Sequence, residues 1–237
     1  LGSIQNALYW DQNTGMPKKG ASWRSEQLTY IAKILHRRNS SEEFSNLIQS
    51  AKNELLDTEQ NSNNQLLNEG KEKNINLLIK EFNRAKNLDP KLVESLAKAK
   101  SKGYESWQEA KKKSDFKVFL PFFEELVKLR IEEAKQISDQ YSPWETLAQP
   151  FEPELTLKWL NKMFQPLKET LPDLIRGINK SKKYHWDLSP ESQQNLCSKL
   201  LDEFGRDKDL VVVGKSPHPF SITLGPNDYR ITTRIVE

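Results

Sequence analysis

The 237-residue chain has one cysteine and three histidines, and this scarcity excludes several kinds of site. Because Cys197 is alone, the chain has no internal disulfide, and such cysteine usage favours a reducing, cytoplasmic location. The histidines are His36, His185 and His218. None has a second histidine four residues on, the spacing that places two imidazoles around a metal on one helical face. The chain alone is therefore expected to hold no metal.

The sequence also lacks a long apolar run and a strong net charge. No apolar stretch approaches the ~20 residues that a membrane-spanning helix needs, so no membrane partner is expected. Lys plus Arg is 36 and Asp plus Glu is 33, which leaves a formal net charge of +3. The lysines of Lys98–Lys102 and Lys111–Lys113 are typical of solvated helix faces. A general nucleic-acid binder would carry a larger basic excess, so no nucleic-acid partner is expected.

Helical patterns dominate the first 206 residues. The segments Ser40–Glu43 and Ser142–Glu145 have the spacing of a capping box, and Asp89-Pro90 and Ser189-Pro190 are typical helix starts. The longest apolar stripe recurs at helical spacing and comprises Leu157, Leu160, Phe164, Leu167, Leu171, Leu174, Ile175 and Ile178. Stripes this wide indicate that helices bury their faces against other helices.

The pattern changes after Asp207. Leu210–Val213, Phe220–Leu224 and Tyr229–Val236 are strand-like, and Gly225–Asp228 has the residues of a turn. The predicted fold is therefore mainly α: an array of long antiparallel helices with a small β-hairpin or sheet near the C-terminus. We expect residues 1–206 to form a helical scaffold and residues 207–237 a β-hairpin substrate-binding segment, within one continuous domain.

Chemically reactive groups gather in the predicted hairpin. Ser216–Phe220 reads SPHPF and Asp228–Arg234 reads DYRITTR, which together supply an imidazole, a carboxylate and two guanidiniums. A guanidinium is a rigid fork of donors suited to a carboxylate, and an imidazole readily exchanges a proton near neutral pH. On spacing alone, a surface hairpin with ordinary charges remains the simpler interpretation.

The pair HPF and D-x-R-x-T resembles the signature of the carboxypeptidase Taq family of zinc metallocarboxypeptidases. The segment Trp10–Pro17, WDQNTGMP, is similar to that family's opening helix and turn, as are Gly20-Ala21, Arg24 and Gln27-Leu28. The resemblance therefore covers nearly the whole chain. It implies a peptide substrate with a free C-terminal carboxylate, and it allows a homodimer.

One part of the family pattern is missing. Family members carry an HExxH zinc helix a short way beyond D-x-R-x-T, and this sequence has no HExxH. The resemblance implies that the chain is the N-terminal part of a metallocarboxypeptidase, inactive alone. The complete enzyme would use zinc or another divalent metal to activate the water that releases C-terminal amino acids. The alternative is a non-catalytic helical interaction module on the same scaffold.

The resemblance also implies roles for single residues. Arg230 matches the family arginine and is expected to bind the substrate carboxylate, and a structural ion pair with Asp228 is the less favoured alternative. His218 is expected to donate to the substrate carbonyl, unless it merely packs in a proline-framed turn. Asp228 would orient Arg230 or the hairpin, and Arg234 is a second candidate for anion contact. No catalytic residue and no metal ligand is expected within the chain itself.

Overall fold

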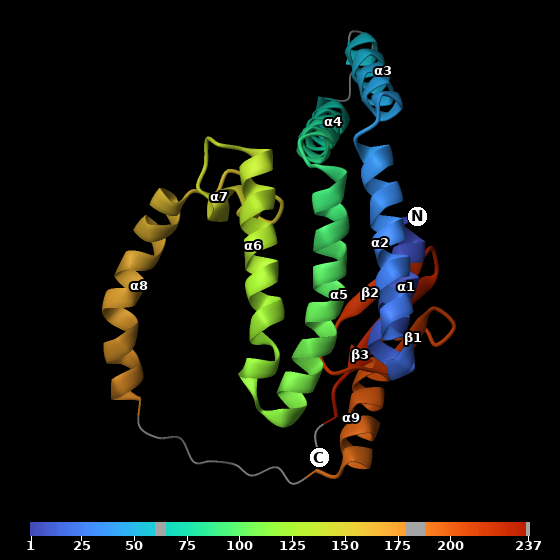
Figure 1. The fold of residues 1–237 in the computed structure, drawn as a ribbon, viewed down its shortest axis with the longest axis vertical. Coiled ribbons are helices and arrows are strands. Elements are labelled where there is room, and N and C mark those ends of the chain that lie inside the picture. Colours follow the sequence, from blue (N-terminus) through green and yellow to red (C-terminus); the bar gives the residue numbers. More distant parts are fainter. Residues whose placement is uncertain (60–64, 179–187, 236–237) are drawn as a thin grey trace. The chain divides into compact units, whose positions relative to one another are not determined.

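The computed structural model describes residues 1–59, 65–178 and 188–235, and these form two compact units, residues 1–139 and 140–237. Figure 1 shows the order of the elements. In the first unit these are α1 (Gly2–Thr14), η1 (Lys18–Gly20), α2 (Ala21–Asn39), α3 (Glu42–Glu59), α4 (Gln65–Lys86), α5 (Pro90–Lys113), η2 (Phe116–Val118) and α6 (Leu120–Ile137). In the second they are α7 (Pro143–Ala148), α8 (Leu157–Gly177), α9 (Pro190–Glu203), β1 (Val211–Lys215), β2 (Ser221–Gly225) and β3 (Asp228–Thr233). The predicted mainly α fold with a small C-terminal sheet is confirmed.

Three helices, α5, α7 and α9, begin where local capping predicts. The Asp89 carboxylate accepts a hydrogen bond from the Lys91 amide at 2.8 Å, with Pro90 at the first helical position of α5. Ser142 and Glu145 form the predicted capping box at α7, and Ser189 caps α9. These starts are predictable because the cap uses only residues within one turn.

The predicted capping box at Ser40 is wrong by one residue. Helix α2 continues to Asn39, so Ser40 ends that helix and its hydroxyl donates to the His36 carbonyl at 2.8 Å. The next serine, Ser41, instead accepts from the Phe44 amide at 3.1 Å at the start of α3. A helix end upstream thus decides which of two adjacent serines can serve as the cap.

Helix α5 is the centre of the first unit and packs between α2 and α6 (Figure 1). Its buried residues are Leu92 and Leu96 near one end, followed by small residues, Ser101, Gly103, Ser106 and Ala110. Small side chains allow neighbouring backbones to approach closely, whereas the leucines supply apolar burial. The small residues thus allow α5 to pack closely against its neighbours.

An aromatic corner joins α5 to α6. The rings of Phe116, Phe119 and Phe123 pack against one another with centroids 5.7–6.3 Å apart. Such tilted and edge-on contacts each stabilise by about 0.5–1.5 kcal/mol beyond their buried area. The Ser106 hydroxyl donates to the Val118 carbonyl at 2.9 Å, which ties the corner back to α5.

The family-like opening segment forms a polar junction between α1, α2 and α5. Arg24 of α2 pairs with Asp11 of α1 at 2.6 Å and also donates to the Leu8 carbonyl at 2.6 Å. The Gln12 amide donates to the Ser101 hydroxyl of α5 at 3.1 Å, and both residues are buried. Because each group is matched by a partner, the junction fixes the angle at which α1 meets the other helices.

A buried carboxylate holds α4 and α6 together. Glu133 is only 6% exposed. One of its carboxylate oxygens pairs with the Arg84 guanidinium of α4 at 3.2 Å, and the other pairs with the Arg130 guanidinium of α6 at 2.5 Å. A carboxylate that is removed from water needs such charge-assisted partners. The Asn87 amide also donates to the Ile137 carbonyl at 3.2 Å, so the same two elements are linked at a second point.

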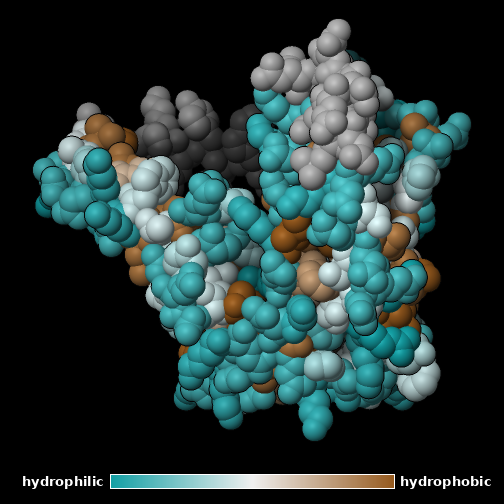
Figure 2. Space-filling model, turned by 90° about the horizontal axis from the view of Figure 1, so that it is seen from above, coloured by the Kyte–Doolittle hydropathy of each residue, from teal (hydrophilic) through white to brown (hydrophobic). Residues whose placement is uncertain are grey.

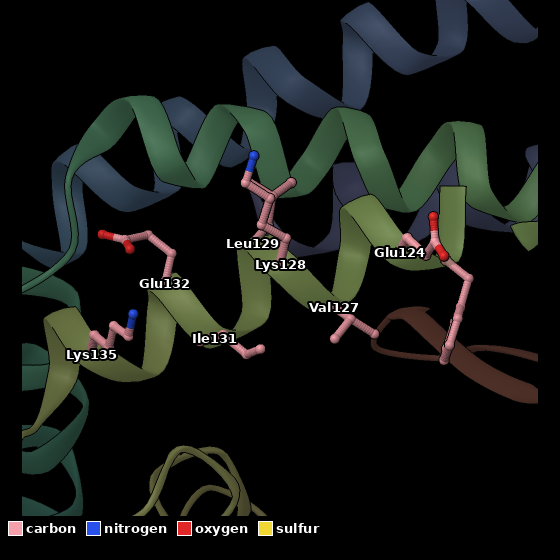
Figure 3. A pocket seen from close by; sticks show the side chains of 8 residues that line it. Glu124, Val127, Lys128, Leu129, Ile131, Glu132 and Lys135 are labelled. Atoms are coloured by element: carbon pink, nitrogen blue, oxygen red, sulfur yellow. The ribbon is translucent and has the colours of Figure 1, made fainter. Parts of the chain in front are cut away.

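One face of α6 is apolar and exposed. Figure 3 shows Val127 and Ile131 projecting from α6 away from the neighbouring helix, with Glu124 and Lys135 at the two ends. These side chains line a shallow pocket of about 520 Å³ along the helix. Figure 2 shows apolar patches, in brown, between the hydrophilic residues that cover most of the visible surface.

In the second unit, the capping box of α7 also positions α8. The Glu145 carboxylate accepts from the Leu157 amide at 2.8 Å, and this bond, with those from Ser142, holds the pKa of Glu145 below its usual range. Helix α8 carries the long apolar stripe, and much of it is exposed: Leu174 by 63% and Ile175 by 64%. No helix within the described parts of the chain is both long and apolar enough to cross a bilayer.

The three strands of the second unit form one sheet in the order β1-β3-β2. Strand β3 pairs antiparallel with β2 and parallel with β1. The turn Pro226-Asn227 joins β2 to β3, and Asn227 adopts a left-handed φ of 63°, which asparagine tolerates. The hairpin is confirmed, but β3 ends at Thr233, and the predicted extension to Val236 reaches beyond the described residues. The predicted boundary at residue 206 falls between α9 and β1 and, as a domain boundary, stays a prediction.

The Glu133 pair yields a stability prediction. Glu133→Gln should lower the free energy of unfolding by about 1.5–3 kcal/mol, because two guanidiniums lose a buried carboxylate and keep only a neutral amide. Chemical denaturation of the 237-residue chain measures this. Glu125→Gln, an exposed change on the same helix, is the matched control and should shift stability by less than about 0.5 kcal/mol. Equal effects of the two changes would contradict the role assigned to Glu133.

Candidate substrate-binding site

Arg230 lies in the centre of the small sheet. In the pairing register it stands between Val212 of β1 and Ile222 of β2. Side chains alternate along a strand, so Asp228, Arg230 and Thr232 share one face of β3. A residue that is paired on both sides has a fixed backbone, and the position from which the guanidinium projects is fixed with it.

Asp228 orients the Arg230 guanidinium. Arg230 Nε donates to Asp228 Oδ1 at 2.7 Å and Nη2 donates to Oδ2 at 3.0 Å, a two-pronged contact. These hydrogen bonds hold the pKa of Asp228 below its usual range and raise the pKa of Arg230 further. The Arg230 side chain keeps 27% of its surface exposed. The ion pair predicted as the simple alternative is therefore present, and the guanidinium still reaches solvent.

Thr232 ties the HPF segment to β3. Its hydroxyl oxygen accepts from the Phe220 amide at 2.8 Å, and its backbone amide donates to the Phe220 carbonyl at 2.8 Å. The hydroxyls of Thr232 and Ser216 lie 2.7 Å apart, and the Ser216 hydroxyl donates to the His218 carbonyl at 2.7 Å. Thr232 is only 3% exposed. One buried hydroxyl thus connects both family-like motifs.

His218 and Arg234 are placed differently from Arg230. His218 lies in the turn between β1 and β2 with its side chain exposed, and its carbonyl is held by Ser216. Arg234 follows the end of β3 and is exposed. The structure therefore brings Asp228 and Arg230 into direct contact and ties the backbone at His218 to the same strand through Ser216 and Thr232. His185 lies outside the described residues.

Two residues of this site were missed by the sequence-based prediction, Thr232 and Ser216. The available signal was spacing, because Thr232 stands two residues after Arg230 and so shares its face of the strand. Ser216 opens the SPHPF segment, where a short side chain commonly bonds the nearby backbone. Both residues hold the backbone of the turn through hydrogen bonds.

Comparison with known proteins now places the chain in a family. The model of the carboxypeptidase Taq (M32) metallopeptidases matches residues 1–237. The chain belongs to the M32 family. It is 28% identical to thermostable carboxypeptidase 1 of Thermus thermophilus, over 100% of this chain and 48% of that protein. It is 29% identical to carboxypeptidase 1 of Bacillus subtilis, over 97% of this chain and 45% of that protein.

Solved M32 structures share the fold. The crystal structure of BsuCP superposes with a TM-score of 0.86 at 28% identity and covers 99% of this chain and 47% of that chain. The Pyrococcus furiosus carboxypeptidase gives a TM-score of 0.75 at 26% identity, over 98% of this chain and 46% of that one. The chain therefore spans about half the length of the M32 relatives that it matches.

M32 enzymes are metallopeptidases, and they therefore need side chains that can hold a metal ion. Within residues 1–59, 65–178 and 188–235, no three His, Cys, Asp or Glu side chains come together in a group that could hold a metal ion. The exposed His218 and the paired Asp228 do not form such a group. The side chains in the described part of this M32 chain therefore do not fit a metal ion.

The hydrogen bond between the Thr232 hydroxyl and the Phe220 amide can be tested by removing the hydroxyl. Thr232→Val keeps the shape and removes the hydroxyl, which leaves the Phe220 amide without its side-chain acceptor. The free energy of unfolding should fall by about 1–3 kcal/mol, and the Phe220 amide should exchange hydrogen faster. Thr233→Val, the same change one residue on and on the other face, should cost less than about 0.5 kcal/mol. Unchanged exchange at Phe220 in Thr232→Val would show that the hydroxyl does not hold the turn.

Proposed function

We propose that this chain is the N-terminal part of an M32 metallocarboxypeptidase and that Arg230 binds the C-terminal carboxylate of the peptide substrate. The observation that carries the proposal is the orientation of the Arg230 guanidinium. Arg230 lies in the centre of the sheet and is paired with Asp228, and 27% of its side-chain surface is exposed. A carboxypeptidase must recognise a free terminal carboxylate and hold it at a fixed distance from the bond that is cut. A cation on a fixed strand provides such a reference point.

The energy of this contact suits the task. A charge-assisted hydrogen bond between a guanidinium and a carboxylate stabilises by roughly 1.5–3 kcal/mol. Because Asp228 already restricts the Arg230 side chain, less conformational entropy is lost when the substrate binds. Asp228 therefore acts as a positioning residue, and the substrate carboxylate approaches the exposed side of the guanidinium.

His218 is assigned the role of a donor to the substrate carbonyl. Its imidazole is exposed, while the tie from Ser216 to its carbonyl fixes the backbone from which the ring projects. A donor that stabilises developing charge on a carbonyl oxygen contributes about 3 kcal/mol to the reaction barrier. Arg234, exposed just beyond β3, is assigned a second anion contact with the substrate.

The remaining features of the complete enzyme follow from the family. The proposal includes zinc or another divalent metal, held by residues other than those described here, and a cytoplasmic location consistent with a single cysteine. A homodimer is the proposed assembly of the complete enzyme. The metal would activate the attacking water, while the residues of this chain bind and orient the peptide.

A second candidate function is a non-catalytic interaction module on the same scaffold. The observation in its favour is the exposed apolar face of α8, since exposed patches of this kind commonly mark interaction surfaces. The two functions differ in what they demand of Arg230, because an interaction module needs no carboxylate selectivity.

Arg230→Ala in the complete enzyme should lower kcat/KM for peptides with a free carboxylate by tens- to hundreds-fold, which corresponds to about 1.5–3 kcal/mol. Peptides amidated at the C-terminus should lose little, because they offer no carboxylate to bind. Arg230→Lys should restore activity only in part, since an ammonium cannot reproduce the two-pronged geometry. Lys215→Ala, an exposed change at the end of β1, is the control and should leave both substrates unaffected. Equal losses on the two kinds of peptide would refute carboxylate recognition.

The 237-residue chain alone should neither retain metal nor cleave peptides. Its described residues provide no group of three metal ligands, and fewer than three protein ligands rarely hold zinc tightly. Elemental analysis after dialysis against zinc or cobalt, with a blocked dipeptide assay, measures both properties. One tightly held equivalent per chain, together with hydrolysis, would refute the proposal that the metal ligands lie elsewhere.

A further inference from the structure

Arg230 is flanked by an aliphatic residue on each neighbouring strand. In the pairing register, Val212 of β1 and Ile222 of β2 both lie directly opposite Arg230. Residues that lie opposite each other in adjacent strands carry their side chains on the same face of the sheet, and the strands are about 4.8 Å apart. Val212, Arg230 and Ile222 therefore form a row across one face, with the cation in the middle.

Val212 presents apolar surface to solvent beside this cation. Its side chain is 46% exposed, whereas Ile222 is half-buried. Asp228 and Arg230 are the only charged residues that the described strands place on this face, and they are paired with each other. Lys215 lies three residues after Val212 and therefore on the opposite face. The side-chain surface that β1 and β2 contribute beside Arg230 is thus aliphatic.

The sheet is open at the end of the row that carries Asp228. Gly225 of β2 is the register partner of Asp228 and has no side chain. Apart from its chain neighbours, a Cβ added to Gly225 would meet no atom within 4 Å. Because the Arg230 guanidinium bonds Asp228, this open space lies next to the ion pair. A ligand larger than a bare carboxylate therefore has room to approach.

We propose that Val212 and Ile222 form the contact surface for the side chain of the peptide's C-terminal residue, so that the site favours an apolar residue there. The inference rests on the carboxylate-binding role proposed for Arg230. When the guanidinium holds the terminal carboxylate, the side chain of that same residue lies within reach of the aliphatic row. An apolar side chain covers Val212, whereas a polar one gives up water and gains no polar partner from the row.

The test is an NMR titration of the 237-residue chain with three small ligands. N-acetylleucine should shift the amide signals of β1, β2 and β3. N-acetylasparagine has a side chain of nearly the same shape but is polar, and it should bind about three- to tenfold more weakly. N-acetylleucinamide keeps the apolar side chain and lacks the carboxylate, and it should bind roughly tenfold more weakly than the acid.

Matched valine variants assign the contact to one face of the sheet. Val212→Thr keeps the branched shape and replaces a methyl group with a hydroxyl, so the preference for leucine over asparagine should fall below about twofold. Val213→Thr is the same change one residue on, where the side chain points to the other face, and the preference should persist.

The ligands separate failure of this inference from failure of the role of Arg230. Equal binding of N-acetylleucine and N-acetylasparagine, or equal loss of the preference in the two variants, overturns the role of Val212 while the acid still binds more tightly than the amide. Equal binding of acid and amide refutes carboxylate recognition, and this inference falls with it. The absence of any shift at up to about 50 mM N-acetylleucine overturns both.

Discussion

Close helix packing around α5 is the constraint on which the helical unit depends. Ser101, Gly103, Ser106 and Ala110 are all buried and all small, so α2 and α6 can approach the backbone of α5. This approach allows Gln12 to bond Ser101 across 89 positions of sequence. A larger side chain at the buried Ser101, Ser106 or Ala110 would displace its neighbours, because protein interiors have little spare volume. A Cβ at Gly103 would reach only ordinary contact with the Phe119 ring, 3.9 Å away.

In the second unit a single buried hydroxyl has a comparable role. Thr232 bonds the backbone of Phe220 and lies against Ser216, which in turn bonds the backbone at His218. Asp228 and Arg230 occupy the same face of the same strand and bond each other. The two motifs that resemble the M32 signature are therefore one structural feature. The spacing of aspartate, arginine and threonine at alternate residues follows directly from strand geometry.

Local chemistry accounts for what could be predicted from the sequence. The helix starts at Asp89, Ser142 and Ser189 were predictable because each needs only a cap within one turn. The predicted cap at Ser40 was wrong because the end of α2 decides which of two adjacent serines can cap the next helix. The parallel pairing of β1 with β3 was not predictable, since a short strand does not specify its partner. Thr232 resembles an ordinary strand residue.

The buried position of Thr232 has a consequence for how such motifs evolve. A threonine that holds a turn is kept by selection for folding, whether or not the protein still cleaves peptides. Asp228 is likewise kept wherever Arg230 must remain charged and oriented. A descendant that has lost its enzymatic activity can therefore retain the letters D-x-R-x-T for a long time. The His218 side chain is exposed, and the hydrogen bond from Ser216 goes to its backbone carbonyl, so changes at His218 would be the earlier sign that selection on catalysis has ended.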